Sequence, residues 1–70
     1  MLRNNHLRDV REKLGLTLQQ LADRAGIGRS TLIEIEAGVS VPRLDTAMRI
    51  ASALGVDISG WKYLFGNEGG

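Results

Sequence analysis

Four runs of apolar residues at helical spacing each end in a glycine, and this pattern constrains the fold more than any other feature of the chain. Residues three and four positions apart share one face of an α-helix, and a glycine that follows them can adopt the left-handed conformation that ends the helix. The glycines are Gly15, Gly26, Gly38 and Gly55. No alternating strand pattern extends beyond four residues. We therefore expect an all-α fold.

The runs predict helices at about 5–14, 17–25, 29–37 and 44–54, and a short fifth helix at about 58–65. Each helix has an apolar face that we expect to point into a common core. These faces consist of Leu7, Val10 and Leu14; Leu18, Leu21, Ala22 and Ala25; Leu32 and Ile35; Leu44, Ala47, Met48, Ala51 and Leu54; and Ile58, Trp61, Leu64 and Phe65.

The second and third helices have the spacing of a helix-turn-helix at about 18–37. Thr17 can cap the second helix while Gln20 bonds back to it, and the third helix starts at Gly28, which offers no side-chain oxygen as a cap. Alanines lie where the two helices would cross, and Gly26 suits the tight turn between them. In a helix-turn-helix the second of the two helices can lie in the major groove of DNA.

The length of 70 residues predicts one small domain, at 1–65, which buries about 60% of the surface of its unfolded chain. Residues 66–70 have nothing apolar to bury, so we expect a disordered tail. The start of the chain does not resemble a signal peptide, and no run approaches the ~20 apolar residues of a membrane span. We expect a cytoplasmic protein that does not contact membranes.

The inventory of reactive side chains argues against an enzyme. The chain has no cysteine, a single histidine, His6, and neither a glycine-rich phosphate loop nor clustered carboxylates. We therefore expect no catalytic residue, no metal site and no cofactor. The nine basic and eight acidic residues are too evenly balanced to indicate a nucleic-acid ligand by charge alone.

At the level of motifs, the chain resembles the helix-turn-helix family of the Cro and phage-repressor type, also called the xenobiotic-response-element family. The resemblance extends from Leu7 to about Phe65. Its motifs are LGLT at 14–17, LA at 21–22, GI at 26–27, Leu32, IEAG at 35–38, Pro42 and IASALGV at 50–56. It implies a compact five-helix DNA-binding domain, usually a homodimeric repressor that binds double-stranded DNA at a near-palindromic operator.

The resemblance also implies which residues would read bases. The third helix would be the recognition helix, and the outward positions would be Arg29, Ser30, Thr31, Ile33 and Glu34. Arg29 is the best candidate, because a guanidinium can bond both O6 and N7 of guanine. Alternatively, Arg29 is a solvated charge or a phosphate contact without base preference. Ile33 could touch a thymine methyl, or could mark a surface for another protein.

Phosphate contacts in the family come from the start of the second helix and from the segment after the third. The resemblance therefore implies Thr17, Gln19, Gly28, Ser40 and Arg43 as phosphate ligands. The chain departs from the family at Leu18, where a glutamine is common, and at Val39 and Val41, in a loop that commonly carries lysine. These departures lower the expected affinity for DNA.

Two further expectations come from the resemblance and from size. The family pairs an arginine of the first helix with a glutamate at the end of the third, which here are Arg11 and Glu36. Trp61, Leu64 and Phe65 would close the core, and could also contact a second copy in a dimer. An alternative function is that of a protein-interaction module, antitoxin-like or an adaptor, since the charge is nearly neutral and the 39–41 loop is apolar.

Overall fold

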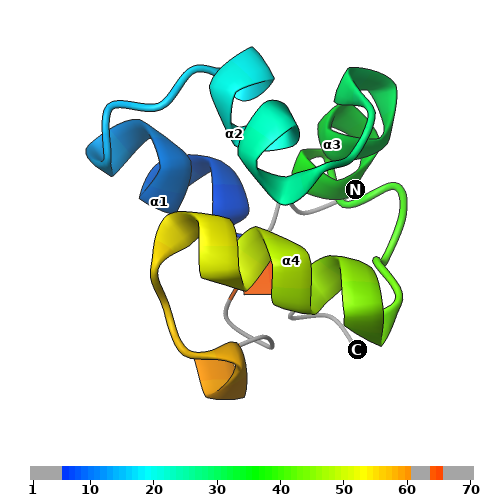
Figure 1. Ribbon diagram of the computed structural model, residues 1–70. Helices are drawn as coiled ribbons and strands as arrows, with labels where there is room; N and C mark the ends of the chain where they lie inside the picture. Colours follow the sequence, from blue (N-terminus) through cyan, green and yellow to red (C-terminus); the bar gives the residue numbers. More distant parts are fainter. Residues whose placement is uncertain (1–5, 61–63, 66–70) are drawn as a thin grey trace.

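The computed structural model describes residues 6–60 and 64–65, and within these ranges the regular structure is helical throughout. The described residues form four α-helices and one short 3₁₀ helix, and Figure 1 shows how the helices are arranged. In chain order they are α1 (Leu7–Lys13), α2 (Leu18–Ala25), α3 (Arg29–Glu36), α4 (Leu44–Leu54) and η1 (Ile58–Gly60). The all-α prediction is confirmed, and no helix among the described residues is long and apolar enough to cross a bilayer.

The expected fifth helix at 58–65 is not present as a single described element. The segment begins as the 3₁₀ turn η1, and residues 64–65 are helical, but Trp61 and its two successors lie outside the described residues. The expected disordered tail at 66–70 and the first five residues also lie outside them. The described structure therefore shows four α-helices where the sequence suggested five.

Each α-helix ends as the glycines predict. Gly15, Gly26, Gly38 and Gly55 all have a positive φ, between 70° and 77°. At the turn of the helix-turn-helix, the N–H of Gly26 donates to the carbonyl of Asp23 (3.2 Å), and the N–H of Ile27 donates to that of Ala22 (3.0 Å). This pair of bonds is a Schellman motif, which satisfies carbonyls at the end of α2 while reversing the chain toward α3.

The core lies where α2 packs against α3 and α4. Figure 1 shows α4 running across the molecule beneath α1 and α2. Ala22 and Ala25 on α2 are buried, and so is Ala47 on α4, so small side chains lie at the buried surfaces of both helices. Larger side chains fill the remaining interior: Leu7, Leu16, Leu21, Leu32, Ile35, Ile50, Leu54, Leu64 and Phe65.

Three residues expected in the core are exposed instead. Leu14 follows the last residue of α1 and lies in the turn, while Leu7 and Arg11 are the buried residues of that helix. Leu44 and Met48 project from α4 away from the interior, which is contacted by Ala47, Ile50, Ala51 and Leu54. The helix lies where the spacing predicts it, but α4 carries two apolar stripes, and spacing alone does not show which stripe faces the core.

Candidate nucleic-acid interface

The outward face of α3 is fixed by the two residues that anchor the helix. Leu32 and Ile35 are buried in the core and Glu36 is buried at the end of the helix, so the other positions of this short helix turn outward. The structure brings the five residues expected to read bases onto this exposed surface: Arg29, Ser30, Thr31, Ile33 and Glu34. The packed core therefore holds α3 in place while these five side chains stay exposed.

The first turn of α3 is open to a ligand. Gly28 precedes the helix in an extended conformation and supplies no side-chain cap, so the free N–H groups of this turn are not bonded by a capping side chain. Arg29 is exposed and makes no hydrogen bond or ion pair with any residue in the described part of the chain. Its guanidinium is therefore available to an external acceptor.

Glu34 is less available than the sequence suggested. Its carboxylate accepts a hydrogen bond from the hydroxyl of Ser40 (3.2 Å), and its backbone carbonyl accepts from the N–H groups of Val39 (3.0 Å) and Ser40 (3.3 Å). The residue thus holds the loop after α3 against the helix. Sequence reasoning assigned Glu34 to bases and Ser40 to phosphates separately, and missed that the two bond to each other.

The start of α2 is engaged in a similar way. The Thr17 hydroxyl accepts from the N–H of Gln20 (3.0 Å), and the N–H of Thr17 donates to the side chain of Gln20 (2.8 Å). This reciprocal capping box is the one predicted from the sequence. The amide of Gln19 donates to Asp23 (2.9 Å). Thr17 and Gln19 remain exposed, but each already has a partner within the helix.

Arg43 lies at the other end of the interface, immediately before α4. It is exposed, adopts an extended backbone and makes no ion pair with the described residues. The hydroxyl of Ser40 and the guanidinium of Arg43 therefore belong to the same connection between α3 and α4. The Ser40 hydroxyl is bonded to Glu34, whereas the Arg43 guanidinium forms no ion pair with the described residues.

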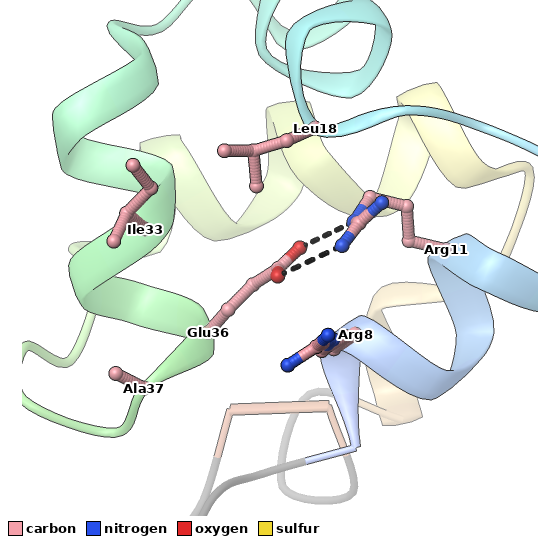
Figure 2. Close-up of a pocket in the computed structure, with 6 residues that line it drawn as sticks. All are labelled: Arg8, Arg11, Leu18, Ile33, Glu36 and Ala37. Atoms are coloured by element: carbon pink, nitrogen blue, oxygen red, sulfur yellow. Dashed lines mark hydrogen bonds and ion pairs between the residues drawn. The ribbon is translucent and has the colours of Figure 1, made fainter.

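A buried ion pair connects α3 to α1 (Figure 2). Arg11 Nε donates to Glu36 Oε2 (2.7 Å) and Arg11 Nη2 donates to Glu36 Oε1 (3.2 Å). The third nitrogen, Nη1, donates to the carbonyl of Leu16 (2.9 Å). The hydrogen bond to Glu36 raises the pKa of Arg11 above its usual value, although burial acts in the opposite direction. The guanidinium thus joins the end of α3 to α1 and to the turn before α2.

A hollow of about 320 Å³ lies beside this ion pair. Figure 2 shows Leu18 from α2 and Ile33 from α3 on its apolar side, with Arg8 from α1 across from them. Arg8 is exposed and pairs with Glu12 at 3.1 Å. Among the described residues, no group of three or more acidic, histidine or cysteine side chains could hold a metal ion.

The aromatic end of the chain contributes to the core. Leu64 and Phe65 are almost completely buried in the same cluster as α2 and α4. Their packing within one chain is the core role that the sequence predicts, and their contact with a second copy stays a prediction. Trp61, the third residue of that expectation, lies outside the described residues.

The family comparison agrees with this geometry. A family model described as helix-turn-helix matches residues 7–61. An uncharacterised HTH-type transcriptional regulator of Methanothermobacter thermautotrophicus is 49% identical over 49 residues, which span 70% of this chain and 71% of the relative. The cryptic phage CTXphi transcriptional repressor RstR of Vibrio cholerae is 30% identical over 80% of this chain. The match spans 50% of the length of that repressor.

The fold also matches a solved structure. The N-terminal DNA-binding domain of SinR from Bacillus subtilis superposes with a TM-score of 0.74, over 80% of this chain and 83% of that domain, at 24% sequence identity. At this identity the likeness concerns the fold. Because the family model matches most of this chain, the chain belongs to the helix-turn-helix family of the Cro and phage-repressor type, whose members are DNA-binding transcriptional regulators and not enzymes.

Proposed function

We propose that this chain is a sequence-specific repressor that inserts α3 into the major groove of double-stranded DNA, as a homodimer on a near-palindromic operator. The observation that carries the proposal is Arg29, an exposed and unpaired guanidinium in the first turn of the second helix of a helix-turn-helix. A helix in this motif contacts base edges through its N-terminal residues.

Base reading would centre on the start of α3. Arg29 can donate to O6 and N7 of one guanine, a contact that discriminates against other bases by about 1–3 kcal/mol. Ser30 and Thr31 offer hydroxyls on the same exposed turn. Further along, Ile33 offers an apolar surface to a thymine methyl, while Glu34 is held by Ser40 and contributes less.

Phosphate contacts would flank the recognition helix. The open N–H groups after Gly28 and the free cation of Arg43 are the best placed, because neither has a partner in the described structure. Thr17 and Gln19 can add hydroxyl or amide donors at the edges of the site, and Ser40 can do so only when its hydroxyl leaves Glu34. With a net charge of only +1, the chain should bind DNA less tightly than a strongly basic domain.

Repression would be steric. Two protomers would place their α3 helices in successive major grooves, about 34 Å apart, and would occupy DNA that other proteins need. Insertion into the groove requires that α3 be held rigidly. The ion pair between Arg11 and Glu36 supports this, because it fixes the end of α3 against α1. The recognition helix is therefore held in place before DNA arrives.

A second candidate function is binding of another protein through the same face. The observation that favours it is the exposure of Ile33 on α3 and of Val39 and Val41 in the following loop. Apolar residues at these positions suit a protein surface better than phosphates. In this case the chain would act as an antitoxin-like protein or an adaptor, which is the alternative function given by the sequence.

Salt dependence separates the two candidates. Binding to mixed-sequence duplex DNA should weaken steeply as salt is added, because each phosphate contact releases a counterion, whereas an apolar protein contact should not weaken. The Arg29→Ala variant should reduce affinity, and Arg24→Ala, which removes an exposed charge from α2, is the matched control. Binding to no duplex even at low salt would contradict DNA recognition and direct attention to a protein partner.

A further inference from the structure

The hollow of about 320 Å³ beside the Arg11–Glu36 ion pair is large enough to hold a small ligand. We call it the ion-pair hollow. Its lining comes from α1, α2 and α3 and from the residue that follows α3: Arg8, Arg11, Leu18, Ile33, Glu36 and Ala37. Sites for small ligands usually join an apolar wall to a few polar groups. The ion-pair hollow has both kinds of surface.

The apolar wall of the ion-pair hollow consists of Leu18, Ile33 and Ala37. Leu18 and Ala37 are half-buried, and Ile33 is 47% exposed. Figure 2 shows the Leu18 side chain of α2 extending toward α3, which carries Ile33. A ligand that fills this space would remove apolar groups of both helices from water, which favours a ligand with an apolar chain.

The charges around the hollow leave one guanidinium only partly engaged. Glu36 accepts from Arg11 through both of its carboxylate oxygens, so this buried pair is neutral as a unit. Arg8 donates to Glu12 through Nε (3.1 Å), and neither of its Nη nitrogens bonds to a residue in the described ranges. These two nitrogens form the end of a planar fork that matches the two oxygens of one carboxylate. One available guanidinium suits a singly charged acid better than a doubly charged phosphate.

We propose that the ion-pair hollow binds a small aliphatic carboxylate, with its acid group on the Nη nitrogens of Arg8 and its chain against Leu18 and Ile33. Ile33 also belongs to the exposed face of α3, so a ligand bound here covers part of the surface that would face DNA. Binding of the carboxylate stands on its own. Its effect on DNA binding rests on the proposed function.

Titration of the full chain with sodium hexanoate, without DNA and at constant ionic strength, tests the site. In carbon–proton NMR spectra the methyl resonances of Leu18, Ile33 and Ala37 should shift along one saturating curve. Those of Leu44 and Met48, which are exposed on α4 outside the hollow, should not shift. Acetate has the acid without the longer chain and should bind at least about tenfold more weakly, because it buries fewer methylene groups. Hexanol, which lacks the acid, should also bind at least about tenfold more weakly.

Two variants with matched controls test the two halves of the site. Arg8→Gln should weaken hexanoate binding about tenfold, and it should leave the fold intact because it breaks only the exposed pair with Glu12. Arg24→Gln removes an exposed cation of α2 that does not line the hollow and should leave the affinity unchanged. Ile33→Gln should also weaken binding, whereas Met48→Gln, which changes a side chain of similar exposure at 51%, should not.

Several results would overturn the proposal. One is the absence of shifts at the methyl groups of Leu18 and Ile33 throughout the titration, and another is a shift centred on Leu44 and Met48. Inorganic phosphate or acetate bound as tightly as hexanoate would show that the apolar wall contributes nothing. Equal affinity of Arg8→Gln and the wild-type chain for hexanoate would remove Arg8 from the site.

Competition with DNA distinguishes this proposal from the proposed function. Hexanoate should weaken binding of the wild-type chain to duplex DNA several-fold relative to sodium acetate at the same concentration, which matches the ionic strength. In Arg8→Gln the two salts should act alike. If hexanoate binds in the hollow but the chain binds no duplex, the ligand site stands and DNA recognition fails. If the chain binds duplex DNA but hexanoate shifts no methyl resonance, DNA recognition stands and the ligand site fails.

Discussion

Arg11 on α1 and Glu36 at the end of α3, 25 positions apart in the sequence, form a bidentate ion pair with Nε–Oε2 and Nη2–Oε1 distances of 2.7 and 3.2 Å. Their residues are only 8% and 7% exposed. Since the remaining guanidinium nitrogen donates to the carbonyl of Leu16, a single side chain joins α1, the α1–α2 turn and α3. The orientation of α3 therefore depends on a residue that lies outside the helix-turn-helix.

Removal of one partner of this pair should strongly destabilise the fold. Glu36→Ala leaves the Arg11 guanidinium buried without its carboxylate, which should lower the free energy of unfolding by about 3–5 kcal/mol. Glu12→Ala is the control, because it breaks the exposed Arg8–Glu12 pair, which should contribute only about 0.3–0.5 kcal/mol. Thermal unfolding followed by circular dichroism gives both values. Equal melting temperatures for the two variants would contradict a structural role for the buried pair.

The turn of the helix-turn-helix should tolerate no side chain at Gly26. An alanine there would have to adopt φ near +70°, which costs about 1–2 kcal/mol for an L-residue. Its Cβ would meet only the Arg49 guanidinium at 3.9 Å, so the cost should come from the backbone and not from a clash. Gly28→Ser should instead stabilise by a few tenths of a kcal/mol, because φ is ordinary there and α3 lacks a cap oxygen. Urea unfolding measures both, and an unchanged Gly26→Ala would contradict this account.

The positions and ends of the helices could be predicted because local chemistry determines them. The capping box of Thr17 and Gln20, and the glycines with positive φ, act over a few residues and are visible in the sequence. The side of α4 that faces the core could not be predicted in this way. Leu44 and Met48 were assigned to the interior and Ile50 was overlooked, because only the packing of α4 on α2 decides between the two stripes.

For the candidate site, the exposed face of α3 could be anticipated from the spacing of Leu32 and Ile35. The bond between Glu34 and Ser40 could not, since the five residues between them in sequence pass through a turn whose course is set by tertiary structure. Arg11 and Glu36 could be paired only through the family resemblance. Nothing in their local sequence indicates a contact between α1 and α3.

The capping box at the start of α2 should contribute measurably to stability. Thr17→Ala removes the oxygen that accepts from Gln20, and should cost about 1 kcal/mol. Thr17→Ser keeps the hydroxyl and should recover most of that loss. Chemical denaturation of the two variants makes the comparison. A serine variant as unstable as the alanine variant would show that the methyl group of Thr17, and not its hydroxyl, carries the effect.

Neutralisation of Glu34 should strengthen DNA binding. Glu34→Gln removes a negative charge from the exposed face of α3, where it would repel phosphates, yet keeps an oxygen that can accept from Ser40. Affinity for duplex DNA should rise several-fold at low salt, and the gain should shrink as salt is added. Asp57→Asn, which makes the same change of charge beside η1, is the control. An equal gain in both variants would mean that net charge alone, and not the position of Glu34, sets the affinity.

The most direct test of DNA recognition by α3 is selection of bound duplexes from a random pool at about 0.1 M salt, where non-specific phosphate binding is already weakened. The wild-type chain and Arg29→Ala would be selected in parallel. We predict that the wild type enriches an inverted repeat, and that Arg29→Ala loses the preference at one base position in each half-site. Absence of any enriched sequence, or an identical preference in both proteins, would contradict the account of Arg29 on α3 as the base reader.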